Sequence, residues 1–138
     1  MKTFELIDIS GDAGIRAYGE TLPDLFLNAA MGMYSLITDP ADVREERNIA
    51  LDLESHSPEG LLVSWLNELI FHFDTYGFVG KTIRIAALLG NTISARVSGE
   101  DFDPERHEKR LLIKAATYHR LSIEKKEGQW VAEIIFDI

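Results

Sequence analysis

The first stretch of the chain with a clear hydrophobic period covers residues 21–37. Apolar side chains recur there every three or four positions, which is the spacing of an amphipathic helix. Thr21, with Asp24 three residues later, forms a capping-box-like start. The helix should end at Asp39-Pro40, because the residue before a proline avoids helical geometry. The pattern therefore predicts a first helix over about 21–37.

A second helical period follows over about 58–75. Ser57-Pro58 is a strong start signal, since a serine hydroxyl can cap the helix and proline suits its first position. The apolar residues after it form a broad stripe that ends before Gly77. Trp65 belongs to this stripe, so we predict that its side chain packs in the core between the second helix and the sheet.

Elsewhere apolar and polar residues alternate or form short apolar runs, as in strands. Strands are predicted at 3–9, 14–19, 43–54, around 83–85 and 93–97, and at about 110–118, 121–126 and 130–137. Residues 10–13 are predicted as a loop, and Gly90-Asn91 as a two-residue hairpin turn. The pattern predicts an α+β fold: two helices packed on one face of a largely antiparallel or mixed β-sheet, in a single two-layer domain over residues 1–138.

Charge and composition narrow the class of function. The chain has 138 residues, a formal net charge of -9 and no cysteine. A disulfide framework, a thiolate zinc site and a thiol nucleophile are excluded. We expect a cytoplasmic protein without a membrane anchor, since no apolar segment suits a signal peptide or a membrane span. The acidic balance disfavours tight direct binding to nucleic acid and suits a cation or a basic protein partner, although solubility alone would also explain it.

Common catalytic motifs are missing from the sequence. It contains no phosphate-binding glycine loop and no nucleophile elbow, and its four histidines lack the spacing of a zinc site. His119, at the end of a predicted strand, suits either a contact to a partner or a structural histidine bonded to the backbone. A nucleotide-binding protein and a zinc hydrolase are therefore poor interpretations.

One candidate site remains, made of two aspartates at the ends of predicted elements. Asp12 lies in a loop flanked by glycines, and Asp137 directly precedes Ile138. Carboxylates, together with a main-chain or terminal oxygen of Ile138, are the ligands that hard cations prefer. The alternative is that neither aspartate binds a metal, because a loop aspartate and a carboxylate near a chain end are common.

These motifs resemble the archease family over essentially the whole chain. Residues 4–19 are similar to the family's opening, usually a D-H-T-A-D-x-G-I pattern, and the segment GLLVSWLNEL at 60–69 resembles its second-helix signature. Residues 99–107 and 114–119 are similar to its later motifs, and Asp137-Ile138 matches its ending. The chain departs from the pattern at 9–11, where Ile-Ser-Gly stands in place of His-Thr-Ala.

The resemblance implies an accessory protein, not an enzyme. The family activates the GTP-dependent RNA ligase of tRNA splicing and RNA repair, by promoting transfer of GMP onto the ligase's own histidine and keeping the ligase turning over. It also implies that Asp12, Asp137 and Ile138 hold a divalent cation, usually calcium, near the interface, and it suggests partner contacts at Asp8, Lys114 and His119. Two alternatives stay open: a chaperone-like specificity factor for a tRNA methyltransferase, and a stand-alone metal-dependent hydrolase.

Overall fold

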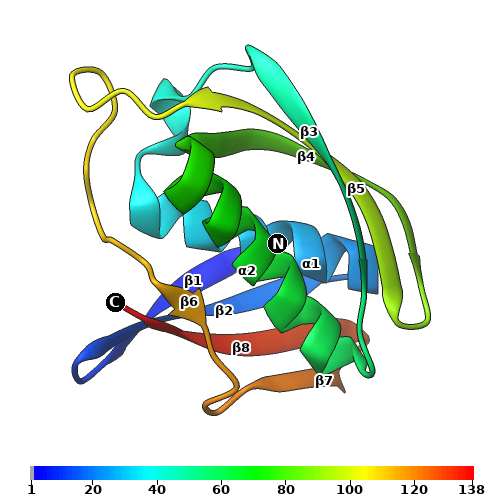
Figure 1. The fold of residues 1–138 in the computed structure, drawn as a ribbon. Coiled ribbons are helices and arrows are strands. Elements are labelled where there is room, and N and C mark those ends of the chain that lie inside the picture. Colours follow the sequence, from blue (N-terminus) through cyan, green and yellow to red (C-terminus); the bar gives the residue numbers. More distant parts are fainter. Residues whose placement is uncertain (1) are drawn as a thin grey trace.

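The computed structural model describes residues 2–138, which form two α-helices, eight β-strands and a short 3₁₀ helix (Figure 1). In chain order the elements are β1 (Phe4–Ile9), β2 (Asp12–Gly19), α1 (Leu22–Ile37), η1 (Pro40–Asp42), β3 (Arg47–Glu54), α2 (Pro58–Tyr76), β4 (Phe78–Leu89), β5 (Thr92–Asp101), β6 (Ala115–Ala116), β7 (Ser122–Lys126) and β8 (Gln129–Asp137). Neither helix is long and apolar enough to cross a membrane.

Both predicted helices are confirmed, with the predicted start signals in use. The Thr21 side chain accepts a hydrogen bond from the Asp24 N–H at 3.2 Å. The Ser57 hydroxyl caps α2 in the same way, accepting from the Gly60 N–H at 3.0 Å. Gly77 ends α2 with a positive φ of 71°, a conformation that costs glycine little.

The strands form two separate antiparallel sheets. One sheet has five strands in the order β1-β2-β8-β6, with β7 also paired to β8. The other has three strands in the order β3-β5-β4. The β4–β5 hairpin turns at Gly90-Asn91, as predicted, with Gly90 at a φ of 60°. The predicted α+β class and the largely antiparallel pairing are confirmed.

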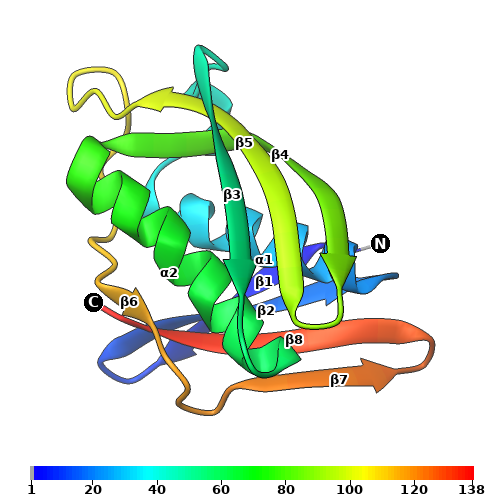
Figure 2. The same cartoon turned by 45° about the vertical axis from the view of Figure 1, so that its right-hand side comes forward.

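The two helices lie between the two sheets, whereas the sequence pattern predicted one sheet with the helices on one face (Figures 1 and 2). The burial of α1 explains the difference. Its buried residues are Leu25, Phe26, Ala29, Ala30, Gly32, Met33, Tyr34, Leu36 and Ile37. At 100° per residue they cover more than half of the helix circumference, so α1 needs apolar partners on more than one side.

One hydrophobic cluster joins all of these layers. Trp65 on α2 is fully buried within it, as predicted, and its indole N–H donates to the Phe26 carbonyl of α1 at 3.0 Å. Trp65 therefore ties the second helix to the first helix as well as filling the core. This hydrogen bond pairs the indole N–H, which a buried tryptophan would otherwise leave without a partner.

The predicted strand at 110–118 is mostly wrong. Only Ala115 and Ala116 form a strand, β6, which pairs with the last residues of β8. The rest of that edge of β8 is occupied by β7. Apolar residues of this segment do not alternate as in a strand: Ile113 is buried in the core, while Leu111 and Leu112 are exposed.

Candidate functional site

Asp12 is positioned by a tight hairpin between β1 and β2. The two strands pair up to Ile9 and Asp12, so only Ser10 and Gly11 form the turn. Gly11 takes a positive φ of 82°, which a turn this short requires. Asp12 is thus the first residue of β2, and the prediction that it lies in a loop at 10–13 is wrong. The carboxylate is attached to a rigid element.

The register between β2 and β8 brings Asp12 to Asp137. The last paired residues of the two strands are Ala13 and Phe136, and continuing this register by one residue places Asp12 opposite Asp137. Directly opposed Cβ atoms of an antiparallel pair lie about 5 Å apart. Figures 1 and 2 show the end of β8 beside β6 and near the turn that joins β1 to β2. The fold therefore sets the start of β2 beside the end of β8, although residues 12 and 137 lie far apart in the sequence.

Among the residues that the structure describes, no basic side chain forms an ion pair with these two carboxylates. They lie on the same face of the sheet as Arg16 and Glu133, since residues two positions apart on a strand share a face. Arg16 is already paired with Glu5 at 2.9 Å and with Glu133 at 3.1 Å. Within residues 2–138, neither Asp12 nor Asp137 forms an ion pair. Two like charges at opposed positions repel, and a cation would relieve that repulsion.

The carboxylate oxygens of Asp12 and Asp137 are the type of ligand that a hard cation prefers. Calcium takes six to eight oxygen ligands, which include carboxylates, main-chain carbonyls and water. In the described part of the chain, no group of three or more His, Cys, Asp or Glu side chains could hold a metal. Asp12 and Asp137 would therefore need main-chain oxygens or water beside them. Ile138, which follows Asp137 directly and is 42% exposed, could offer one.

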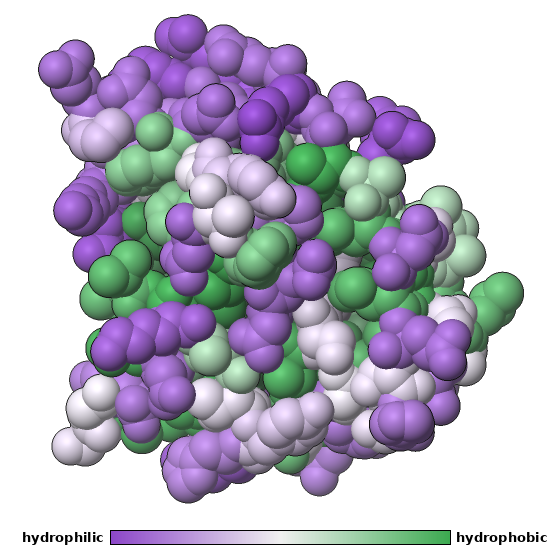
Figure 3. Space-filling model, in the orientation of Figure 1, coloured by the Kyte–Doolittle hydropathy of each residue, from purple (hydrophilic) through white to green (hydrophobic). Residues whose placement is uncertain are grey.

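Lys114 joins this region through its main chain. Its N–H donates to the Asp137 carbonyl at 2.8 Å, and Ala115 pairs with Asp137. A shallow groove of about 430 Å³ lies between this segment and α2, lined by Asn67, Ile70, Phe71, Asp74, Thr75, Lys114 and Ala115. Figure 3 shows apolar side chains among polar ones on the face where α2 lies. The side chain of Lys114 is exposed.

The other predicted contacts do not converge on the two aspartates. Asp8 is exposed and pairs with Ala13 of β2, so it lies on the opposite face of the sheet from Asp12. His119 is exposed in the turn after β6, and its main-chain N–H donates to the Thr117 hydroxyl at 3.3 Å. Both remain available for contact with a partner.

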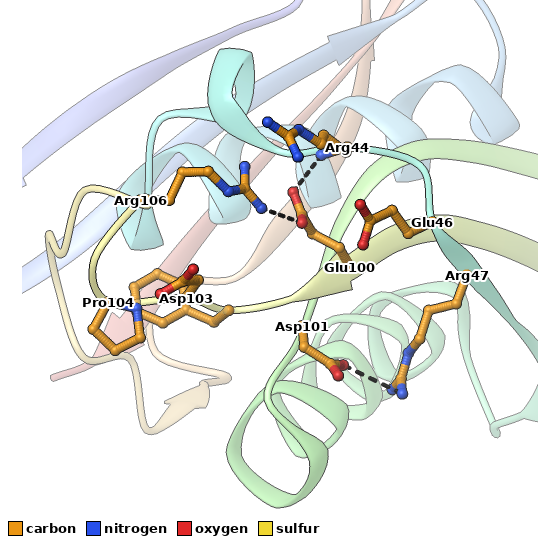
Figure 4. Close-up of a pocket in the computed structure, with 9 residues that line it drawn as sticks. Arg44, Glu46, Arg47, Glu100, Asp101, Asp103, Pro104 and Arg106 are labelled. Carbon is orange, nitrogen blue, oxygen red and sulfur yellow. Dashed lines mark hydrogen bonds and ion pairs between the residues drawn. The ribbon is translucent and has the colours of Figure 1, made fainter.

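A second polar cluster, around Glu100, was not predicted (Figure 4). Glu100 is 3% exposed and lies at the end of β5, beside a pocket of about 630 Å³. Its carboxylate accepts from the Arg44 N–H at 2.6 Å, pairs with the Arg106 guanidinium, and lies 3.1 Å from His107 Nε2. His107 Nδ1 accepts from the Asp103 N–H, so Nε2 carries the proton and donates to Glu100.

This cluster shifts the pKa of Glu100 downwards. Burial alone would raise the pKa, but the hydrogen bonds from the Arg44 N–H, Arg106 and His107 outweigh it and lower the pKa below its ordinary value of 4.5. Through these bonds and the bond from the Asp103 N–H to His107, the cluster fastens residues 44 and 103–107 to β5. No local pattern in the sequence could reveal it, because Glu100 and Arg44 are 56 residues apart.

We expect Glu100→Gln to destabilise the protein by about 2 kcal/mol at neutral pH, because it weakens hydrogen bonds made to a charged acceptor. The folded-state pKa of Glu100 is lowered, so its stabilising effect is present above pH 4.5 and is lost as the pH falls through the folded-state pKa. The difference from wild type should shrink in acid. Urea unfolding across this pH range measures it.

Glu45→Gln is the matched control, since Glu45 is an exposed acid next to Arg44 in the loop before β3. It should change stability little at any pH. A Glu100→Gln protein as stable as wild type at neutral pH would contradict the role assigned to this cluster.

Comparison with known proteins identifies relatives over the full length. The model of the Archease protein family matches residues 4–138. Protein archease of Methanosarcina mazei is 36% identical, covering 99% of this chain and 97% of its own length. The solution structure of Methanobacterium thermoautotrophicum protein 1598 superposes with a TM-score of 0.83 at 33% identity, covering 100% of both chains. The crystal structure of a Thermotoga maritima protein described as "an archease, possible chaperone" shares the fold, with a TM-score of 0.68 at 17% identity, covering 100% of this chain and 98% of its own.

Proposed function

The chain belongs to the archease family, and from this premise we propose that it is an accessory protein that activates a GTP-dependent RNA ligase in tRNA splicing or RNA repair. The observation that supports the proposal is that Asp12 and Asp137 lie on adjacent strands whose register, continued by one residue, sets them opposite each other, with no ion pair to either in residues 2–138. These are two of the three residues that the resemblance assigns to a cation near the working interface.

In this proposal the carboxylates of Asp12 and Asp137 and a main-chain oxygen of Ile138 hold the cation, for which calcium is the expected identity. When bound, the cation supplies the positive charge that lets these two carboxylates lie side by side. Ile9 pairs with Asp12 across the hairpin. An apolar side chain therefore occupies the position where the family pattern has histidine, and that position offers no further ligand here.

The bond-making chemistry belongs to the ligase, onto whose histidine GMP is transferred. The part of this chain is to present a surface that favours that transfer. Asp8, Lys114 and His119 are exposed and are proposed as contacts to the partner. A net charge of -9 suits a basic RNA-handling enzyme, because complementary charge speeds encounter.

Two other functions compete with this proposal. One is a chaperone-like specificity factor for a tRNA methyltransferase, in which case the same surface would alter the products of the methyltransferase. The other is a stand-alone metal-dependent hydrolase, in which case the isolated protein would turn over a substrate by itself.

The deciding experiment measures guanylylation of the ligase with radiolabelled GTP, with and without this protein, at several time points. We expect faster guanylylation and repeated ligation cycles when the protein is present. Parallel reactions with a tRNA methyltransferase, and with the isolated protein on phosphoester and peptide substrates, test the competing functions. A ligase whose guanylylation and turnover are unchanged by the protein contradicts the proposal.

A further inference from the structure

The end of β8 that carries Asp137 is supported by β2 on one side and by β6 on the other, and these two supports differ greatly in length. On one side β8 pairs with β2 over seven rungs, from Ala13–Phe136 to Gly19–Trp130. On the other side β6 contributes only two residues, of which Ala115 pairs with Asp137. A two-residue strand has too few hydrogen bonds to stay in place by itself. Something else must fix β6 against the end of β8.

Asn67 of α2 provides that support. Its side-chain oxygen accepts a hydrogen bond from the Ala116 N–H at 2.8 Å, and its side-chain nitrogen donates to the Ala116 carbonyl at 3.2 Å. One amide thus binds both main-chain groups of a single strand residue, as a neighbouring strand would. Since Asn67 uses both groups of Ala116, the amide closes this sheet edge and anchors it to a long helix.

The anchor is linked to the candidate cation site by short main-chain steps. Ala116 pairs with Phe136, Ala115 pairs with Asp137, and the Lys114 N–H donates to the Asp137 carbonyl. Just beyond β6, the Thr117 N–H and hydroxyl both donate to the Ile135 carbonyl, at 3.0 and 2.8 Å. The segment 114–117 therefore follows the last residues of β8 closely, and its place is set by Asn67.

We propose that Asn67 is a positioning residue that holds Asp137 where its carboxylate can share a cation with Asp12. This role rests on the function proposed above. Residues that orient ligands without touching the metal change metal affinity by about 10- to 100-fold when removed. The Asn67 amide acts in this way through β6: it binds Ala116, and the neighbouring Ala115 pairs with Asp137.

Asn28 offers a matched control on the other helix. It is half-buried like Asn67, and its side-chain nitrogen donates to the Tyr18 carbonyl at 2.7 Å. It therefore ties α1 to β2 by the same chemistry, but near the end of β2 away from Asp12. Asn28→Ala should destabilise the fold without moving either aspartate.

The test is a titration with terbium, a luminescent substitute for calcium, on calcium-free protein, with calcium as competitor. We expect Asn67→Ala to bind terbium about tenfold more weakly than wild type, and Asn28→Ala to bind it like wild type. Hydrogen exchange should also show faster exchange of the Ala116 amide in Asn67→Ala. Circular dichroism checks that each variant is folded, and Asn67→Ser carries the test should Asn67→Ala not fold.

The outcomes separate this inference from the function on which it rests. A wild-type protein that binds neither terbium nor calcium overturns the cation site and the role of Asn67 together. Wild-type binding that Asn67→Ala leaves unchanged overturns only the role of Asn67. Equal weakening in Asn67→Ala and Asn28→Ala also overturns it, because loss of general stability would then explain the effect.

Discussion

Asp12→Asn and Asp137→Asn are each expected to weaken calcium or terbium binding by about 100-fold or more, beyond the typical effect of changing a residue that only orients a ligand. Asparagine keeps nearly the same shape but removes the charge that a hard cation favours. Because the β2–β8 register, continued one residue past Ala13–Phe136, sets the two aspartates opposite one another, losing either one halves the acidic donors of the proposed site. Terbium luminescence and calorimetric calcium titrations give the affinities.

Thermal unfolding should show a change of sign between conditions. With calcium removed by a chelator, each variant should be at least as stable as wild type, since one of two repelling like charges is gone. With calcium in excess, wild type should gain melting temperature and the variants should not, because a ligand stabilises the folded state only where it binds. The same variants should stimulate ligase guanylylation weakly.

Asp52→Asn is the control for these variants. Asp52 is exposed on β3, in the other sheet. It should bind calcium like wild type. Affinity unchanged in Asp12→Asn and Asp137→Asn would place the cation elsewhere. Folded variants that lose the cation yet stimulate the ligase fully would show that cation binding is incidental to activation.

Trp65→Ala is expected to cost roughly 3–5 kcal/mol of folding free energy, the range for removing a large aromatic side chain from a core. Trp65 is fully buried, and it also donates to the Phe26 carbonyl at 3.0 Å. The substitution would leave a cavity between the helices and remove the indole hydrogen bond, so that the Phe26 carbonyl keeps only its partner within α1. Urea unfolding followed by circular dichroism measures the loss.

Trp65→Phe separates the two contributions, because it retains most of the volume but loses the hydrogen bond. It should cost about 1 kcal/mol from the bond, plus a smaller packing loss. Trp130→Ala is the control, since Trp130 is only half-buried on β8 and should cost less. A Trp65→Ala protein that unfolds at the wild-type urea concentration would mean that this contact does not stabilise the core.

The helices and most strands could be predicted because their signals are local. Thr21 and Ser57 bond to N–H groups three residues ahead, and Gly90 sits in a two-residue turn. Such preferences act between residues close together in the chain, so a short stretch of sequence is enough to predict them. The α+β class follows from the resulting order of helices and strands.

Segment 110–118 shows where local reasoning fails. Its residues suit a strand, yet a strand needs a free edge to pair with. β7 takes most of that edge of β8, and only Ala115 and Ala116 find partners there. The division of strands into two sheets has the same origin: α1 is apolar around more than half of its circumference, and only tertiary packing decides what covers each side.

The candidate site divides in the same way. The sequence by itself determined the chemistry: Asp12 and Asp137 are carboxylates, Ile138 follows the second, and the motifs around them resemble those of one family. Only the tertiary structure decided that the two aspartates lie on adjacent strands and that Asn67 fixes the strand beside them. Residue type is a local property, whereas the register between β2 and β8 depends on pairing between two segments far apart in the chain. Closing so long a loop costs conformational entropy, and only the burial of the whole core offsets that cost.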